Sequence, residues 1–271
     1  MVKTLFALAG LLATTGAYAQ APPIAYAEGG SRGDAIYLVN PDGTGRTKVY
    51  QGKTASRTGA PINRMAMRSN DGGGEIAFIE SERVLMVQPH LASGQPDGRA
   101  YSVNVPTGSS CILGDLDYLM NGTLVVADSC GQAWAVAPEA RTATRHFEAY
   151  INSLTALENS ILFVENGSNR LKSWGSGGTT DITTVSQPAN YIDATATKLF
   201  LSDTLSFHTV QLSSPYTDTP GCTRGGMTEV SPAGSQIVYI YRGFLMVHSA
   251  TCSGSPVRVG RDARSFAWRT Y

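Results

Sequence analysis

The stretch LVNPDGTGRTKVY, residues 38–50, has the pattern of two β-strands joined by a tight turn. An apolar run ends at Asn40, and Asp42-Gly43 then provides the backbone angles that most residues avoid in hairpin turns. Residues 47–50 again have the composition of a strand. The stretch therefore predicts one β-hairpin, and the rest of the chain determines whether this hairpin is one unit of a repeat.

Apolar runs of the same kind recur along the chain and divide it into six units. The intervals between successive units are 52, 48, 37, 38 and 38 residues. A second apolar run follows the first within about a dozen residues in every unit. A period near 40 residues with several strands per period is the sequence signature of a β-propeller. The intervals are measured from Ile24, Ile76, Leu124, Ile161, Leu199 and Ile237.

The two ends of the chain complete this pattern. Five units contain a further strand-like segment before the first apolar run, whereas the first unit begins directly at Ile24. The final residues 263–271, ARSFAWRTY, have the composition of the missing strand. Pairing this strand with the N-terminal blade would close the ring and remove exposed sheet edges. We predict one all-β domain, a six-bladed β-propeller over residues 20–271. An irregular β-sandwich with accidental spacing is the alternative.

The first residues have the pattern of a secretory signal peptide. Lys3 precedes a short apolar run over residues 5–12, and Ala17 and Ala19 form a small-residue cleavage motif. We predict that residues 1–19 are removed and that the mature protein is periplasmic or secreted, without insertion in a membrane. There is no Cys at the cleavage point for lipid attachment. The alternative is an uncleaved anchor, for which the apolar run is short.

Charge and cysteine content narrow the class of protein further. Loss of Lys3 would leave 20 basic against 21 acidic residues, and only 15% of the chain is charged. Such a chain lacks the basic surface that binding to nucleic acid requires.

Four cysteines in an exported chain favour disulfides, and four allow three pairings. We favour the pairings that are local in sequence, which are Cys111–Cys130 and Cys222–Cys252.

Residues 24–50, IAYAEGGSRGDAIYLVNPDGTGRTKVY, resemble a repeat unit of the TolB-like six-bladed propellers, a family with WD-like repeats. Residues 230–241, VSPAGSQIVYIY, are similar to the Trp-Ser-Pro-Asp-Gly unit of the same family, with Ala-Gly in place of Asp-Gly. The resemblance covers the propeller part only and does not include the amino-terminal domain of TolB. It implies a six-bladed fold, a cell-envelope location and binding to another protein.

Polar side chains occur on the predicted innermost strands, which line the central channel of a propeller. Some of these side chains should therefore converge in the channel. One interpretation is a solvated channel with internal ion pairs. The other is a site for a divalent cation such as Ca²⁺, with Asp115, Asp193 and Glu229 as candidate ligands, because hard cations take oxygen ligands. The complete set is Arg64, Asp115, Asp117, Asn152, Asp193, Glu229 and Arg264.

No sequence motif predicts a catalytic residue. The G-x-S-x-G match at residues 29–33 lies between two predicted strands and lacks the helix that a nucleophile elbow needs. The leading hypothesis is a non-enzymatic, monomeric propeller that binds another envelope or secreted protein. The enzymatic alternative is a metal-dependent hydrolase or sugar dehydrogenase of the gluconolactonase-like six-bladed class, with its metal in the channel. A sensor or structural propeller is the third hypothesis.

Overall fold

The computed structural model describes residues 23–31, 33–52, 61–70, 72–185, 189–203, 207–213, 215–221 and 226–268. The predicted signal peptide, residues 1–19, lies outside the described residues, so its cleavage stays a prediction. Within the described ranges, no helix is long and apolar enough to cross a membrane.

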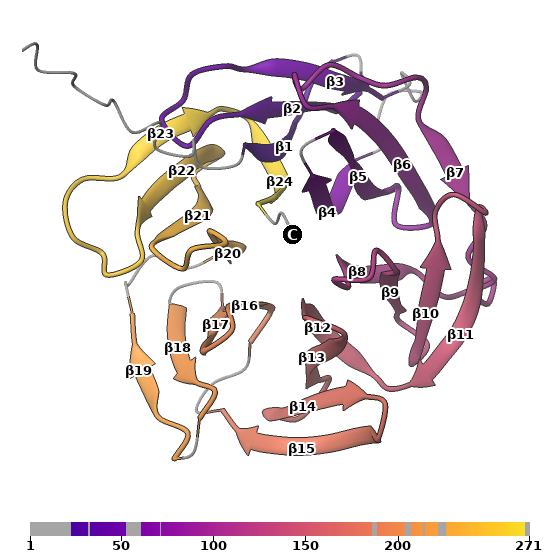
Figure 1. Cartoon of the computed structure of the whole chain (residues 1–271), viewed down its shortest axis with the longest axis vertical. Helices are drawn as coiled ribbons and strands as arrows, with labels where there is room; N and C mark the ends of the chain where they lie inside the picture. Colours follow the sequence, from indigo (N-terminus) through magenta and orange to yellow (C-terminus); the bar gives the residue numbers. More distant parts are fainter. Residues whose placement is uncertain are drawn as a thin grey trace, which may run out of the picture.

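The described residues form six four-stranded antiparallel sheets, which are arranged as blades around a central axis (Figure 1). Blade one combines the C-terminal strand β24 (Ala263–Ala267) with β1 (Ile24–Glu28), β2 (Ala35–Val39) and β3 (Thr47–Gln51). Each other blade takes four consecutive strands. The predicted all-β six-bladed propeller is confirmed.

The other five blades follow in chain order. Blade two contains β4 (Ile62–Asn70), β5 (Gly73–Glu80), β6 (Val84–Leu91) and β7 (Tyr101–Val103). Blade three contains β8 (Leu113–Tyr118), β9 (Leu124–Asp128), β10 (Gln132–Ala137) and β11 (Thr142–Glu148). Blade four contains β12 (Ile151–Leu157), β13 (Ser160–Glu165), β14 (Arg170–Gly175) and β15 (Gly178–Thr184). Blade five contains β16 (Tyr191–Ala194), β17 (Lys198–Ser202), β18 (Phe207–Gln211) and β19 (Asp218–Pro220). Blade six contains β20 (Thr228–Val230), β21 (Gln236–Tyr241), β22 (Phe244–Ser249) and β23 (Val257–Gly260).

The C-terminal strand closes the ring, as the sequence predicts. β24 pairs antiparallel with β1, and Phe266 lies opposite Tyr26 in this pairing. Trp268 follows the strand and is fully buried. The first and last parts of the described chain therefore share one blade, and β1 has a hydrogen-bonded neighbour on both sides.

The hydrophobic core lies between neighbouring blades. One cluster joins Ile79 and Leu85 of blade two to Leu124 and Val126 of blade three. The second strand of a blade is covered by a neighbouring blade on each face, so it is apolar on both faces. β9 is buried at every residue. The outermost strands contact solvent, and β15 is mostly exposed.

The stretch 38–50 forms the outer hairpin of blade one, between β2 and β3. Gly43 has a φ of 85° and its N–H donates to the Asn40 carbonyl at 2.8 Å. The Asp42 carboxylate accepts from the Thr44 hydroxyl at 2.7 Å and from the Thr44 N–H at 2.9 Å, and these two bonds lower the pKa of Asp42. A Cβ on Gly43 would lie 3.6 Å from the carbonyl oxygen of Arg258 in β23. The hairpin therefore also packs against blade six.

The disulfide Cys111–Cys130 is present, with a Cα–Cα distance of 5.5 Å. This pairing confirms one of the two predicted disulfides. Because such bonds persist in oxidising compartments, it also indicates an extracytoplasmic location. Cys252 is disulfide-bonded, but Cys222, its predicted partner, lies outside the described residues, so that pairing stays a prediction.

Replacement of both Cys111 and Cys130 by Ser should lower the free energy of unfolding by about 3 kcal/mol. The bond closes a loop with a sequence separation of 19, and its loss returns conformational freedom to the unfolded chain. Urea denaturation followed by circular dichroism measures the change. Ser110→Ala, which changes the residue immediately before Cys111, controls for local disturbance. A loss below about 1 kcal/mol would contradict the expected contribution of the crosslink.

Candidate functional site in the central channel

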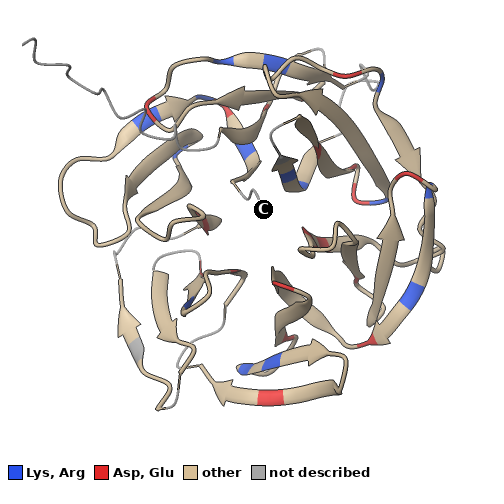
Figure 2. Cartoon of the chain, in the orientation of Figure 1, with Lys and Arg blue, Asp and Glu red and all other residues tan. Residues whose placement is uncertain are grey.

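The innermost strand of every blade contributes side chains to a cavity in the central channel. The lining residues come from β4, β8, β12, β16, β20 and β24 and their immediate neighbours. Figure 2 shows basic residues on β4 and β24 and acidic residues on β8 and β20 around this channel. The cavity leaves about 40 Å³ for water-sized molecules. Five of the seven predicted channel residues line the cavity, namely Arg64, Asp115, Asp117, Asp193 and Glu229.

The other two predicted channel residues are bonded elsewhere, which corrects the expectation for them. The Asn152 Nδ2 donates to the Ala189 carbonyl at 2.5 Å. Arg264 lies 3.5 Å from Asp34, and its side chain is 48% exposed. Side chains alternate along a strand. Ser153, the neighbour of Asn152, lines the cavity instead, and the lining residues of β24 are Phe266 and Ala267.

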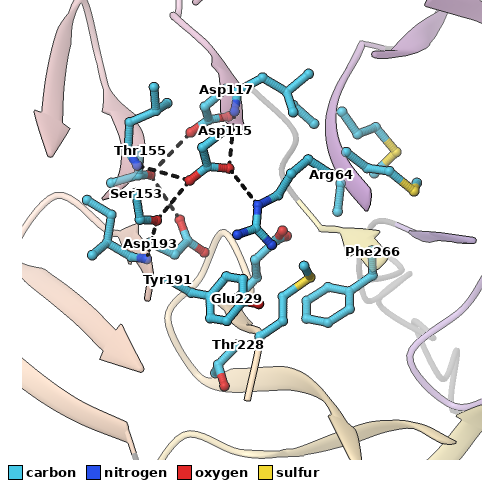
Figure 3. Close-up of a pocket in the computed structure, with 18 residues that line it drawn as sticks. Arg64, Asp115, Asp117, Ser153, Thr155, Tyr191, Asp193, Thr228, Glu229 and Phe266 are labelled. Atoms are coloured by element: carbon cyan, nitrogen blue, oxygen red, sulfur yellow. Dashed lines mark hydrogen bonds and ion pairs between the residues drawn. The ribbon is translucent and has the colours of Figure 1, made fainter. Parts of the chain in front are cut away.

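Arg64 forms the charged centre of the cavity together with Asp115 and Tyr191 (Figure 3). Its Nε lies 3.5 Å from Asp115 Oδ1, and its guanidinium carbon lies 4.4 Å from the centre of the Tyr191 ring. Burial acts to lower the pKa of Arg64, but Asp115 and Tyr191 outweigh burial and raise this pKa above its ordinary value. Arg64 is therefore held as a cation beside a carboxylate.

Two carboxylates of blade three bond to the backbone of blade four. Asp115 Oδ2 accepts from the Leu154 N–H at 3.0 Å and from the Ser153 hydroxyl at 2.8 Å. Asp117 Oδ2 accepts from the Ala156 N–H at 2.7 Å and from the Thr155 hydroxyl at 3.1 Å. Hydrogen bonds to charged groups are stronger than neutral ones, so these contacts fix β8 against β12.

Similar contacts cross the remaining junctions between blades. The Ile192 N–H donates to the Ser153 hydroxyl at 3.0 Å. Asp193 accepts from the Val230 N–H at 2.7 Å, and Glu229 accepts from the Trp268 N–H at 2.6 Å. The Ser265 hydroxyl donates to the Ile62 carbonyl at 2.9 Å. Together with the Arg64–Asp115 ion pair, a polar side chain bridges every junction. We call this set the junction ring, which comprises Arg64, Asp115, Asp117, Ser153, Asp193, Glu229 and Ser265.

Glu229 has the most perturbed environment in the junction ring. Burial raises the pKa of Glu229 well above its ordinary value of 4.5, and the charge of Asp193 raises it further. The hydrogen bond from the Trp268 N–H opposes this change but does not outweigh it. Folding therefore shifts the titration of this carboxyl group to higher pH.

Glu229→Gln should remove part of the dependence of stability on pH. Because the folded protein has the higher pKa, wild-type stability from this group is present below pH 4.5 and is lost as pH rises through the folded pKa. The difference in free energy of unfolding between E229Q and wild type should therefore grow in favour of E229Q, by on the order of 1 kcal/mol or more by pH 8. Urea denaturation across this range measures it, with the exposed Glu139→Gln as control. A constant difference would contradict the assignment.

The carboxylates predicted to hold Ca²⁺ are already bonded to the protein. Asp115 and Asp193 each accept hydrogen bonds at both carboxylate oxygens. Among the described residues, no group of three or more His, Cys, Asp or Glu side chains is arranged to hold a metal ion. A cation here would compete with backbone N–H donors, and the Ca²⁺ site at Asp115, Asp193 and Glu229 stays a prediction.

Two open grooves lie away from the junction ring. One has a volume of about 470 Å³ and lies between blades six and one, where Arg46, Arg258 and Arg261 line it with aromatic residues. The other has a volume of about 410 Å³ and lies between blades two and three, lined in part by Arg68 and Glu75. The sequence analysis predicted neither groove.

Comparison with known proteins supports the fold. No protein-family model matches the sequence, and no curated protein matches it. A chain in the crystal structure of a nidogen/laminin complex has a TM-score of 0.68 at 10% identity, over 90% of this chain and 97% of that chain. A Bacteroides caccae protein of unknown function has a TM-score of 0.52 at 12% identity, over 91% and 98%. A proposed 6-phosphogluconolactonase from Bacteroides uniformis has a TM-score of 0.51 at 10% identity, over 91% and 99%. At these identities the similarity shows the six-bladed propeller fold alone.

Proposed function

We propose that this protein is an exported, non-enzymatic propeller that binds another protein of the cell envelope. The contrast between its channel and its outer surface carries the proposal. The channel residues bridge the blades and leave about 40 Å³, whereas pockets for small molecules usually measure about 300–1,000 Å³. The groove between blades six and one lies at the outer surface, and Arg and aromatic side chains line it. These residue types are enriched at protein interfaces.

Three further observations support the proposal. The Cys111–Cys130 disulfide suits a protein outside the cytoplasm, and the signal peptide predicted over residues 1–19 agrees with this location. The TolB-like pattern of residues 24–50 implies an interaction module of the cell envelope, and closure of the ring favours a monomer. A chain of the nidogen/laminin complex has a similar fold, so the same architecture occurs in a complex of two proteins.

A channel enzyme is the second candidate function. The carboxylates of Asp115, Asp193 and Glu229 surround one cavity, and a proposed 6-phosphogluconolactonase has a similar fold. In this case Ca²⁺ would bind to these carboxylates and the substrate would enter the channel mouth. Calorimetric titration with Ca²⁺ and assays of lactone hydrolysis, with Asp193→Asn as the variant, test this candidate.

Binding to a purified partner tests the leading proposal. Mature protein tagged at one end is incubated with envelope extract from its source organism, once with calcium and once with a chelator, and retained proteins are identified by mass spectrometry. Each retained protein is then purified, and its binding is measured by surface plasmon resonance against the folded and the heat-denatured propeller. We expect saturable binding to the folded propeller only. Equal binding to both forms, or no saturable binding, would contradict the proposal.

A further inference from the structure

We propose that the groove between blades six and one binds an acidic peptide segment of the partner protein, an inference that rests on the proposed protein-binding function. The groove has a volume of about 470 Å³. Three of its lining residues are arginines and none is acidic. We call it the arginine groove, which comprises Tyr26, Arg46, Phe244, Arg258, Val259, Gly260 and Arg261.

Contacts with blade one hold Arg46 in place. Its Nε donates to the Tyr26 hydroxyl at 2.7 Å, and its Nη2 lies 2.5 Å from Glu28. Its guanidinium carbon lies 3.5 Å from the centre of the Tyr37 ring. The side chain is nevertheless 38% exposed. A cation that is already ordered loses little conformational entropy when it binds a ligand.

A β-bulge in blade six lies between the other two arginines, Arg258 and Arg261. Leu245 pairs with Gly260 while Met246 pairs with Arg258, so Val259 is an extra residue on β23. A bulge bends its strand and changes where side chains point. Val259 is buried, whereas Arg258 is exposed, as is Arg261 three residues further along the chain. The guanidinium carbon of Arg258 lies 4.9 Å from the centre of the Phe244 ring.

Two glycines allow the walls of the groove to approach each other. A Cβ on Gly260 would lie 2.9 Å from the Tyr26 ring, so a larger residue there would displace the ring. On the other side, Gly43 of the β2–β3 hairpin packs against the backbone of Arg258. Figure 2 shows this hairpin beside a basic residue of β23. The groove is therefore a fixed feature of the contact between blades one and six.

The side chains around the groove indicate the chemistry of its occupant. Glu28 is paired with Arg46, and Asp42 on the adjoining hairpin accepts two hydrogen bonds from Thr44. The exposed Asp262 follows Arg261 in the chain, but the residues that line the groove itself include three arginines and no acidic residue. Guanidinium groups bind carboxylates through paired hydrogen bonds, and the exposed side chains of Tyr241, Phe244 and Val257 on the same blade offer apolar contacts. These features fit a peptide in which carboxylates alternate with apolar side chains.

A fluorescein-labelled ten-residue peptide that alternates Glu with Leu serves as the probe, and fluorescence polarisation measures its affinity. The variants are R258E/R261E and the charge-matched control R141E/R170E, which changes exposed arginines of blades three and four. We expect the wild type and the control to bind alike within about twofold, and R258E/R261E to bind at least about tenfold more weakly. Affinity should fall as salt concentration rises. Circular dichroism checks that each variant is folded, and R258Q/R261Q provides a milder second variant.

Three results of the peptide assay would overturn the inference. The first is equal affinity for a peptide that alternates Gln with Leu. The second is undiminished binding by R258E/R261E. The third is that inorganic phosphate displaces the acidic peptide when both supply the same concentration of negative charge. This result would indicate a site for any anion. A partner captured from the envelope that binds R258E/R261E as well as wild type would overturn the groove assignment and leave the proposed function standing. Peptide binding that R258E/R261E loses, with no envelope partner recovered, would support the groove and contradict the proposed function.

Discussion

A chain that ends at Asp262 is expected not to form the propeller. The truncation removes β24, the hydrogen-bonded neighbour of β1, and with it Phe266 and Trp268, which are 1% and 0% exposed. Loss of one large buried aromatic side chain costs about 3–5 kcal/mol, and the whole stability of a domain is about 5–15 kcal/mol. The truncation also removes the Trp268–Glu229 and Ser265–Ile62 hydrogen bonds. Far-UV circular dichroism and size-exclusion chromatography measure the loss of fold.

Two companion experiments distinguish the effect of ring closure from the general effect of removing buried residues. A synthetic peptide with the sequence of residues 263–271 should restore β-sheet signal to the truncated chain, because the missing strand has a defined place beside β1. Trp268→Ala in the full chain should lower the free energy of unfolding by about 3–5 kcal/mol while keeping the fold. A truncated chain that unfolds with wild-type cooperativity and stability would refute the closure argument.

The sequence predicted the inner strands of the blades far better than the outer ones. The second strand of a blade, such as β9, is buried on both faces, so its apolar run is visible without a structure. β15 is mostly exposed and consists largely of Gly, Thr and Asp. Such a segment is a strand because it pairs with β14, and this dependence on a neighbour leaves no apolar pattern in the chain.

The channel was predicted in outline but not in detail. The residue types on the inner strands indicated Asp115, Asp117 and Asp193, yet their bonding partners were not identified. Asp117 and Ala156 are 39 residues apart, and Asp193 and Val230 are 37 apart. These separations match the repeat period, because each bond joins corresponding strands of adjacent blades. The period alone does not reveal which residue on each strand points inward, so Asn152 was expected where Ser153 lies.

The arginine groove shows what only closure of the ring reveals. Arg46 and Arg258 belong to opposite ends of the described chain, and the groove forms where blade one meets blade six. The bulge at Val259 directs Arg258 outward, and a bulge of this kind leaves no distinct signal in residue composition. A surface site that spans the closure is therefore hidden from any analysis of single repeat units.

Asp117→Ala is expected to lower the free energy of unfolding by about 2–5 kcal/mol, the cost of about two unsatisfied buried donors. The Asp117 side chain is 8% exposed. It accepts from the N–H groups of Tyr118 and Ala156 and from the Thr155 hydroxyl. Alanine would remove this acceptor from the Tyr118 and Ala156 N–H groups, whereas the Thr155 hydroxyl also donates to Asp193 Oδ1 at 3.3 Å. An unsatisfied buried donor costs about 1–3 kcal/mol. Urea denaturation, with circular dichroism as the signal, measures the change.

Two further variants distinguish the role of Asp117 from that of an ordinary carboxylate. Asp117→Asn keeps one acceptor oxygen. Its amide NH₂ group replaces the other oxygen and would face a hydrogen-bond donor, so the stability of this variant should fall between those of wild type and D117A. Asp181→Ala removes a carboxylate that is 64% exposed and whose nearest ion-pair distance is 3.8 Å, and such surface pairs contribute about 0–1 kcal/mol. If D117A cost no more than D181A, the junction ring would be a solvated channel lining that contributes little to cohesion. The expected difference would instead show that the carboxylates of the channel stabilise the contacts between blades, which explains why a near-neutral chain concentrates acidic groups at its axis.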